Sequence, residues 1–275
     1  MPTKKAFDFV KIDEVPPKPR KKGIVEMRGP YYTPVSLGYL ENILDTWGEY
    51  VDGVKFAGGS MRLMKLVDVK KFLKICHDHD CYVSTGGFVE RIIVQGQKAV
   101  DRYFEECKTL GFDMVEISSG LAPIPIEDKV AMVKEVKRLG MMPKPEITMM
   151  EGAGAGTHIA NYKPKMRPFS EFVREAKLQL KAGAHILMFE SEGVYEDMAP
   201  KDWKLNIVKS VIKEFGLNAW MFEAADPVVF KWFLQNYGSD TNVFIDHSQV
   251  TEYTAWRCKL WGDHRIWQGK KVSYK

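Results

Sequence analysis

The chain has 275 residues, of which 45% are hydrophobic and 28% charged, a composition typical of a globular protein with a large buried core. Its net charge is +4, and residues 1–22 alone carry this surplus, with seven basic and three acidic groups. The remainder is formally neutral, which argues against nucleic acid as a partner. Because no apolar run could span a membrane and no secretory signal is visible, the sequence predicts a cytoplasmic protein that does not bind membranes.

Three parts of the chain differ in pattern. Residues 1–22, which include VPPKPRKK, are predicted to form a flexible basic arm. Residues 23–262 are predicted to form one folded domain, and residues 263–275 a C-terminal tail. The four cysteines are too few for a disulfide scaffold, and Cys76 and Cys107 fit apolar helix stripes, so packing is their expected role.

Short apolar runs alternate with amphipathic stretches throughout the central part. The runs predict strands at residues 23–29, 51–58, 81–87, 114–120, 144–147, 185–191, 219–224 and 242–247. Helical spacing of apolar residues between them predicts helices, several of which end at a glycine such as Gly111 or Gly183. Eight βα units in this length favour a (β/α)8 TIM-type barrel over an open doubly wound sheet, and no GxGxxG follows the first run.

A long connection follows the fifth predicted strand. It covers residues 148–168, contains GAGAG and His158, and ends before Ser170, which is expected to cap the next helix. Because a loop of this length at the C-terminal end of a barrel strand is usually functional, it is predicted to be a lid over the mouth. No GK[ST] follows the glycines, so a phosphate loop is not favoured.

Polar residues at the C-terminal ends of barrel strands share one mouth. Here they are Glu26, Arg28, Lys55, Ser84, Thr85, Glu116, Ser118, Glu146, Glu190, Glu192, Glu223, Asp246 and His247. Carboxylates from at least four strands would repel one another unless a cation lay among them, and a hard divalent ion such as Mg2+ suits oxygen ligands. The expected metal ligands are Glu116, Glu146, Glu190 and Glu223. Ion pairing of some carboxylates with Lys55 and Arg28 is the alternative.

Several of these residues suggest chemistry on a small anionic organic acid. Arg28 and Lys55 would bind its negative charge, with Ser118 and Glu192 as further binding residues. The expected catalytic residues are Lys55, Glu116, Glu146 and His247. His247 suits either an acid/base role or a supporting one.

A second histidine cluster is less favourable for chemistry. His77 and His79, in CHDHD, precede the third predicted strand and so lie at the opposite end of the barrel. They could form a zinc site with Cys76 and Cys81, but a solvated helix end is favoured.

Six segments, in the same order, resemble the phosphosulfolactate synthase superfamily, and within it the branch of plant heat-stress-associated proteins. They are VEMRGPYYT, VDGVKFAGGS, HDHDCYVSTGG, ECKTLGFDMVEIS, MFEAADPVVFKWFLQNYG and NVFIDHSQV. The resemblance extends from about Gly23 to Gly262 and implies a (β/α)8 barrel. It also implies Mg2+-dependent addition of sulfite to phosphoenolpyruvate, an early step toward coenzyme M, and places Lys55, Glu116, Glu146 and Glu223 at the active-site mouth.

Two departures from the family pattern bear on the substrate. Enzymatic members have an Asp-Lys pair where this chain has Met27 and Arg28, and an arginine-containing stretch where it has FESEGVYED. The lost cation and the added Glu192, Glu196 and Asp197 disfavour a phosphorylated substrate.

The leading hypothesis is therefore a Mg2+-dependent lyase or synthase that acts on an enol or unsaturated carboxylic acid. The rivals are a non-catalytic stress protein that keeps the barrel, and a barrel enzyme recruited to a non-phosphorylated substrate. The sequence leaves the formation of a homo-oligomer open.

Overall fold

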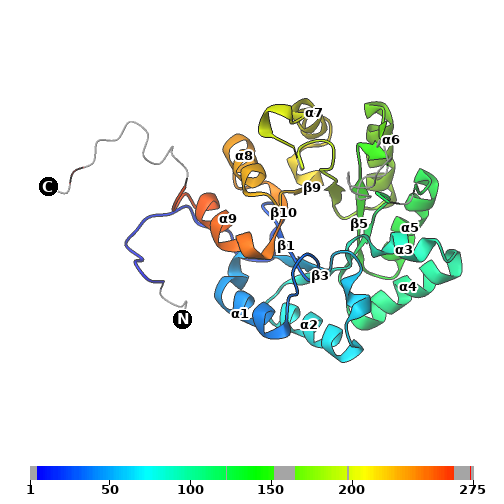
Figure 1. Ribbon diagram of the computed structural model, residues 1–275, viewed down its shortest axis with the longest axis horizontal. Coiled ribbons are helices and arrows are strands. Elements are labelled where there is room, and N and C mark those ends of the chain that lie inside the picture. The colour runs from blue at the N-terminus through cyan, green and yellow to red at the C-terminus, as the bar shows by residue number, and fades with distance from the viewer. Residues whose placement is uncertain (1–4, 122, 152–164, 197, 263–272, 274–275) are drawn as a thin grey trace.

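A computed structural model of the protein describes residues 5–121, 123–151, 165–196, 198–262 and 273, which contain a closed barrel of eight parallel strands (Figure 1). The strands are β1 (Val25–Arg28), β2 (Gly53–Lys55), β3 (Tyr82–Ser84), β4 (Met114–Ile117), β5 (Met142–Ile147), β8 (Leu187–Phe189), β9 (Trp220–Glu223) and β10 (Asn242–Ile245). They are arranged in the order β1-β10-β9-β8-β5-β4-β3-β2, and pairing of β1 with β10 closes the barrel. The predicted (β/α)8 fold is confirmed, with every strand inside or overlapping its predicted run.

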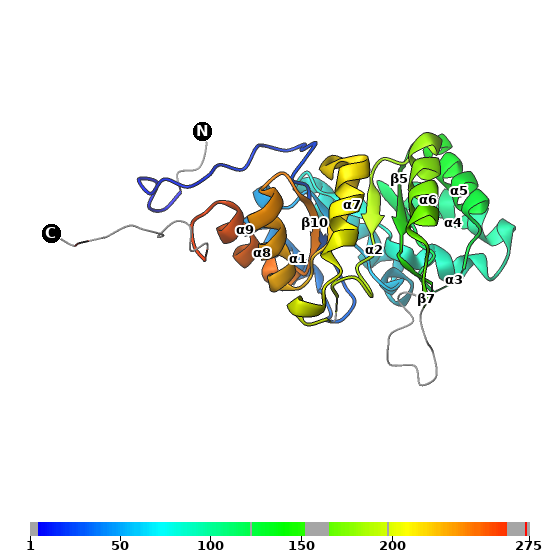
Figure 2. The same cartoon turned by 90° about the horizontal axis from the view of Figure 1, so that it is seen from above.

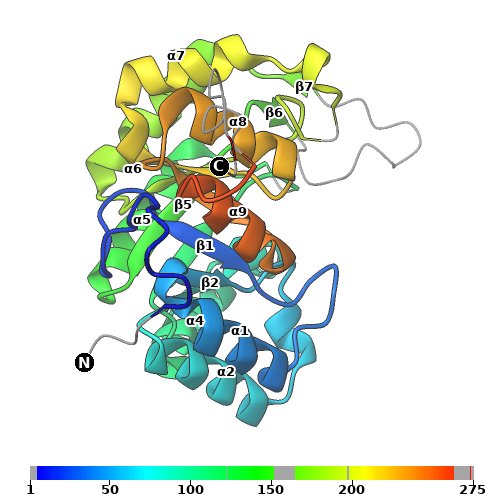
Figure 3. The same ribbon diagram turned by 90° about the vertical axis from the view of Figure 1, so that its left-hand side faces the viewer.

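Helices surround the barrel and cover its outer face. They are α1 (Leu37–Trp47), α2 (Leu66–Asp78), α3 (Val89–Ile93), α4 (Gln97–Leu110), α5 (Ile126–Arg138), α6 (Phe169–Ala182), α7 (Leu205–Phe215), α8 (Pro227–Tyr237) and α9 (Val250–Arg257). Figure 3 shows the last helix, α9, between α8 and β1. Cys76 and Cys107 are buried on α2 and α4, as their positions on apolar stripes predicted. Among the described residues, no helix is both long and apolar enough to cross a membrane.

Strand pleating separates apolar side chains from polar ones. Successive side chains of a strand point to opposite faces, so Val54 and Val115 pack toward the helices while Lys55 and Glu116 point into the barrel. An apolar cluster fills another part of the interior and consists of Met114, Ile186, Met188, Met221 and Phe244. All of these except Ile186 stand two residues before a polar strand end. The polar strand ends therefore face a common space.

The connection after β5 differs from the predicted irregular loop at its two ends. There β6 (Met150–Glu151) and β7 (Lys165–Met166) pair antiparallel. Ser170 does not cap α6, which was the expectation: Pro168 is the N-cap and the helix begins at Phe169, so Ser170 lies in its first turn. Residues 152–164, with His158 and the glycine-rich run predicted to act as a lid, lie outside the described residues.

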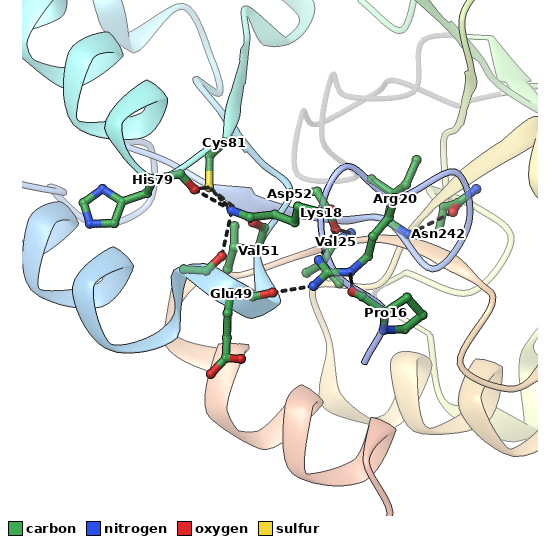
Figure 4. Close-up of polar contacts among 12 residues, drawn as sticks. Pro16, Lys18, Arg20, Val25, Glu49, Val51, Asp52, His79, Cys81 and Asn242 are labelled. Carbon is green, nitrogen blue, oxygen red and sulfur yellow. Dashed lines mark hydrogen bonds and ion pairs between the residues drawn. The ribbon is translucent and has the colours of Figure 1, made fainter. Parts of the chain in front are cut away.

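The end of the predicted arm contacts the barrel through its basic side chains. Figure 2 shows residues 5–22 along the side of the barrel opposite β7. In Figure 4, the Lys18 ammonium group donates to the backbone oxygens of Gly48 and Val51, at 2.9 and 3.0 Å, and to that of His79. Arg20 lies 3.0 Å from Asp52, whose carboxylate also accepts the Val25 backbone N–H. The arm thus lies over the N-terminal end of the barrel, where its cations bind the loops that precede β2 and β3. A sequence pattern does not show that these groups are near one another.

We expect Lys18→Met to lower the free energy of unfolding by about 2 kcal/mol, because carbonyl groups that now accept from a charged donor would lose it. Urea unfolding monitored by circular dichroism measures this effect. Lys21→Met, at an exposed position of the same arm, is the control and should change stability by less than about 0.5 kcal/mol. Equal effects of the two substitutions would contradict the anchoring role of Lys18.

Candidate active site at the barrel mouth

Four charged side chains from four strands meet inside the barrel. Lys144 Nζ lies 2.5 Å from Glu26 Oε2 and 3.0 Å from Glu116 Oε2, and Lys55 Nζ lies 2.9 Å from the same Glu116 oxygen. Strands β5 and β1 are not neighbours, so Lys144 and Glu26 can meet only across the interior. All four residues are at most 5% exposed. A barrel of this type is usually filled by branched apolar residues, so these charges mark an unusual interior.

In the Lys55–Glu116 pair both partners are charged. Burial opposes the charge of Lys55, but the nearby carboxylates, Glu116 foremost and then Glu223, outweigh it and raise the Lys55 pKa above its ordinary value. Burial likewise opposes the charge of Glu116, yet Lys55 and Lys144 hold the pKa of its carboxyl group below the ordinary value. Lys55 is therefore a fixed positive charge at neutral pH and not a base.

Glu146, by contrast, is a neutral acid. Ser118 Oγ lies 2.6 Å from Glu146 Oε1 and also hydrogen-bonds Glu90, although a hydroxyl group can donate only one hydrogen. Glu90 accepts from the backbone N–H groups of Gly120 and Leu121, which makes it the acceptor of the Ser118 proton as well. Burial, then the charge of Glu116, raise the pKa of Glu146 to about 8. Glu146 therefore carries a proton at neutral pH and donates it to Ser118.

Three carboxylates gather at the ends of β8 and β9 and in the connection that follows β8. Glu190, Glu196 and Glu223 each offer an oxygen atom within 4.8 Å of the other two. Ser191 Oγ lies 2.6 Å from Glu196 and 3.1 Å from Glu223. Burial, followed by the charge of Glu223, raises the pKa of Glu190 well above its ordinary value. Oxygen ligands with this spacing and mutual repulsion suit a hard divalent cation, so these residues fit Mg2+.

The first and last strands place two further expected residues at the mouth. Arg28 Nη1 lies 3.4 Å from Asp246, and its guanidinium group lies 4.7 Å from the ring centre of Tyr32 and 5.0 Å from that of Phe244. His247 has both ring nitrogens engaged, with Thr33 Oγ1 at 2.6 Å and the Tyr39 hydroxyl group at 2.9 Å. The sequence left an acid/base role and a supporting role open for His247, and these hydrogen bonds favour the supporting role.

Comparison of the sequence with known protein families identifies the family. The profile of (2R)-phospho-3-sulfolactate synthase matches residues 13–263. The chain belongs to the phosphosulfolactate synthase family. The heat-stress-associated 32 protein of Arabidopsis thaliana is 34% identical over 271 residues, covering 94% of this chain and 93% of the relative. A phosphosulfolactate synthase of Methanothermobacter thermautotrophicus is 25% identical over 266 residues, covering 94% and 96%.

Solved structures agree with the fold of this phosphosulfolactate synthase family member. N-acetylneuraminate lyase of Mycoplasma synoviae superposes with a TM-score of 0.51 at 11% identity, covering 96% of this chain and 76% of the lyase. The carboxyl transferase domain of Rhizobium etli pyruvate carboxylase gives 0.52 at 13% identity, covering 82% of this chain and 40% of that longer chain. At these identities the similarity concerns the fold alone.

Among the residues that the phosphosulfolactate synthase resemblance implied, Lys55, Glu116, Glu146 and Glu223 lie around one mouth. Of the four expected metal ligands, Glu190 and Glu223 are in the three-carboxylate cluster, whereas Glu116 pairs with lysines and Glu146 with Ser118. Glu192 is at the rim, where its backbone N–H donates to Glu190.

Two buried residues, Glu90 and Lys144, were not assigned a role from the sequence, and Glu196 was named only as a charge that disfavours a phosphorylated substrate. The position of Lys144 could have been predicted, because it stands two residues before Glu146 on the same strand and therefore points to the same inward face. Glu90 and Glu196 follow their strands by several residues, so no pleat register could place them.

Two features lie away from the mouth. His77 and His79 bond Asp113 and Asp45, each at 2.8 Å, at the N-terminal end, which agrees with a solvated helix end rather than zinc. A groove of about 940 Å³ lies on the outer wall between α2 and α4, and none of the expected site residues lines it.

Proposed function

We propose that this protein is a Mg2+-dependent lyase or synthase that adds a nucleophile to an enol or unsaturated carboxylic acid, or eliminates one from the product. Membership of the phosphosulfolactate synthase family supports this reaction class. The observation that carries the proposal is the buried carboxyl group of Glu146 on β5, which hydrogen-bonds Ser118 and shares one mouth with Lys55 and the three-carboxylate cluster. Burial raises the pKa of this carboxyl group to about 8, which suits a proton donor. A fixed cation, a metal site and a proton donor are what such a reaction requires.

In this proposal the metal is held by Glu190, Glu196 and Glu223. A bound Mg2+ would supply charge that stabilises the enolate form of the substrate carboxylate. The earlier assignment of Glu116 and Glu146 as ligands is revised here, because Glu116 is needed to hold Lys55 and Lys144.

The remaining residues divide the chemical work. Arg28 and Lys55 attract the substrate carboxylate. The nucleophile, sulfite by analogy with the family, uses its electron pair to form a bond to the β-carbon while the C=C π electrons move toward the carboxylate. Glu146 then gives its proton to the α-carbon, and the proton of hydrogensulfite restores Glu146 through solvent, so no group is oxidised or reduced.

Titration with Mn2+ in a calorimeter tests the metal site. We expect uptake of one ion at the mouth and at least a tenfold loss of affinity in Glu223→Gln. Glu214→Gln removes an exposed carboxylate of α7 and should leave the affinity unchanged. Equal affinities in all three proteins would contradict the assigned ligands.

The metal affinity should rise with pH. Because burial and Glu223 hold the pKa of Glu190 above its ordinary value, the folded protein keeps a proton that must leave before this carboxylate binds a cation. Tighter Mn2+ binding, with release of a proton, is therefore expected as the pH rises. Calorimetry in buffers of different ionisation enthalpy measures the release, and a pH-independent affinity without it would contradict this account.

A second candidate is a stress protein without catalysis, which the 34% identity to the heat-stress-associated 32 protein favours. It predicts no uptake of Mn2+ or Mg2+ despite the carboxylates. The same titration therefore separates the two candidates.

A further inference from the structure

Charge is distributed unevenly around the mouth. Strands β1 and β2 end in Arg28 and Lys55, whose cationic groups lie 5.0 and 4.3 Å from the ring centre of Phe244. The carboxylates of Glu190 and Glu223 lie at the ends of β8 and β9. A substrate anion is therefore drawn to the side formed by β1 and β2, and its reacting carbons lie toward Glu146.

The usual place for a phosphate group is already occupied. In many (β/α)8 enzymes a phosphate binds at the start of a short helix that follows the last strands. Here that helix is the 3-10 helix His247–Gln249 after β10, and its N-cap is Asp246. The Asp246 carboxylate accepts from the backbone N–H and hydroxyl groups of Ser248, at 3.0 and 2.6 Å.

This arrangement repels an anion rather than attracting it. Burial opposes the charge of Asp246, but the bonds from Ser248 and the nearby charges hold the pKa of its carboxyl group below the ordinary value. The start of α8, after the preceding strand, is occupied in the same way, because Asp226 accepts the Val228 backbone N–H at 3.0 Å. Both helix starts after the last two strands thus present a carboxylate to an incoming phosphate.

The cationic side chains inside the barrel are already paired with carboxylates. Each one in the described part of the barrel interior has a carboxylate partner: Arg28 has Asp246, Lys55 has Glu116, and Lys144 has Glu26 and Glu116. Such pairs can still attract one carboxylate, since the Arg28–Asp246 contact is long at 3.4 Å. A phosphate dianion at the start of the His247–Gln249 helix would lie directly beside the Asp246 carboxylate and be repelled by it.

We propose, building on the proposed function, that the substrate of this mouth is a non-phosphorylated unsaturated or enol-ether monocarboxylic acid, whose carboxylate binds between Arg28 and Lys55. Asp246 acts as the specificity residue that excludes a phosphate at the usual position. The addition of sulfite then forms the C–S and C–H bonds described above, and no phosphate takes part.

A matched pair of acids tests this proposal, because 2-methoxyacrylate and phosphoenolpyruvate share one skeleton and differ in a methyl group against a phosphate. The Mg2+-loaded protein is incubated with each acid and sulfite, and the adducts are measured by mass spectrometry. We expect kcat/KM to be at least tenfold higher for 2-methoxyacrylate. Asp246→Asn, which keeps a capping side chain and removes the charge, should raise kcat/KM for phosphoenolpyruvate at least tenfold, whereas Asp240→Asn at the opposite end of the barrel should not.

Preferential use of phosphoenolpyruvate by the unmodified protein would overturn the substrate assignment and leave the proposed function intact. An Asp246→Asn protein without improved use of phosphoenolpyruvate would overturn the role of Asp246. No reaction and no binding of either acid by the Mg2+-loaded protein would instead contradict the proposed function, and the substrate assignment would fall with it.

Discussion

Replacing Lys144 with methionine should destabilise the protein by about 3–5 kcal/mol, because the change leaves buried carboxylates without their cation. Lys144 is fully buried and lies between Glu26 on β1 and Glu116 on β4. Urea unfolding at neutral pH measures the loss. The exposed Lys134→Met substitution on α5 is the control and should change stability by less than about 0.5 kcal/mol.

The loss should depend on pH in a defined direction. In the unmodified protein the pKa of Glu116 lies below its ordinary value of 4.5, so the stabilisation is present above that pH and is lost as the pH falls. Without Lys144, burial favours protonated carboxyl groups, and the variant loses stability as the pH rises. The difference between the two proteins should therefore be largest at neutral pH and shrink toward about pH 4. A constant difference would contradict the pairing, as would full stability of the variant at neutral pH.

Glu146→Gln should reduce turnover by about 10²–10⁴-fold while the protein stays folded, because glutamine can still bond Ser118 but cannot supply the proton. The rate of the unmodified protein should fall as the pH rises through about 8, where Glu146 loses its proton. This limb of the pH profile should be absent from the residual activity of the variant. Steady-state rates across pH, with thermal unfolding to check the fold, measure both effects. Unchanged turnover would remove Glu146 from the reaction.

Local sequence patterns were sufficient to predict the barrel. Most strands are short apolar runs bounded by glycine or polar residues, and helices α4 and α6 end at Gly111 and Gly183, with positive φ angles of 96° and 104°. Such features depend on neighbours in the chain, so a single sequence contains them. The same argument placed Lys55, Glu116 and Glu146 at one mouth, because parallel strands end on one side.

Features that depend on closure of the barrel were not predicted. The Lys144–Glu26 pair joins residues 118 positions apart on opposite walls. Lys18 reaches carbonyl groups from the loops around β2 and β3, and no periodicity indicates that contact. The division of the carboxylates into a metal cluster, a neutral acid and a lysine partner likewise follows from distances among side chains, which the sequence does not contain.

The central claim is that this mouth adds a nucleophile to an unsaturated acid in a metal-dependent reaction. The most direct measurement is mass-spectrometric detection of a sulfite adduct when the purified protein, Mg2+ and sulfite are incubated with phosphoenolpyruvate and 2-methoxyacrylate. The account predicts an adduct of at least one acid, lost on addition of EDTA and in Glu223→Gln. No adduct from the folded, Mg2+-loaded protein, or an adduct that forms equally with EDTA present, would contradict it.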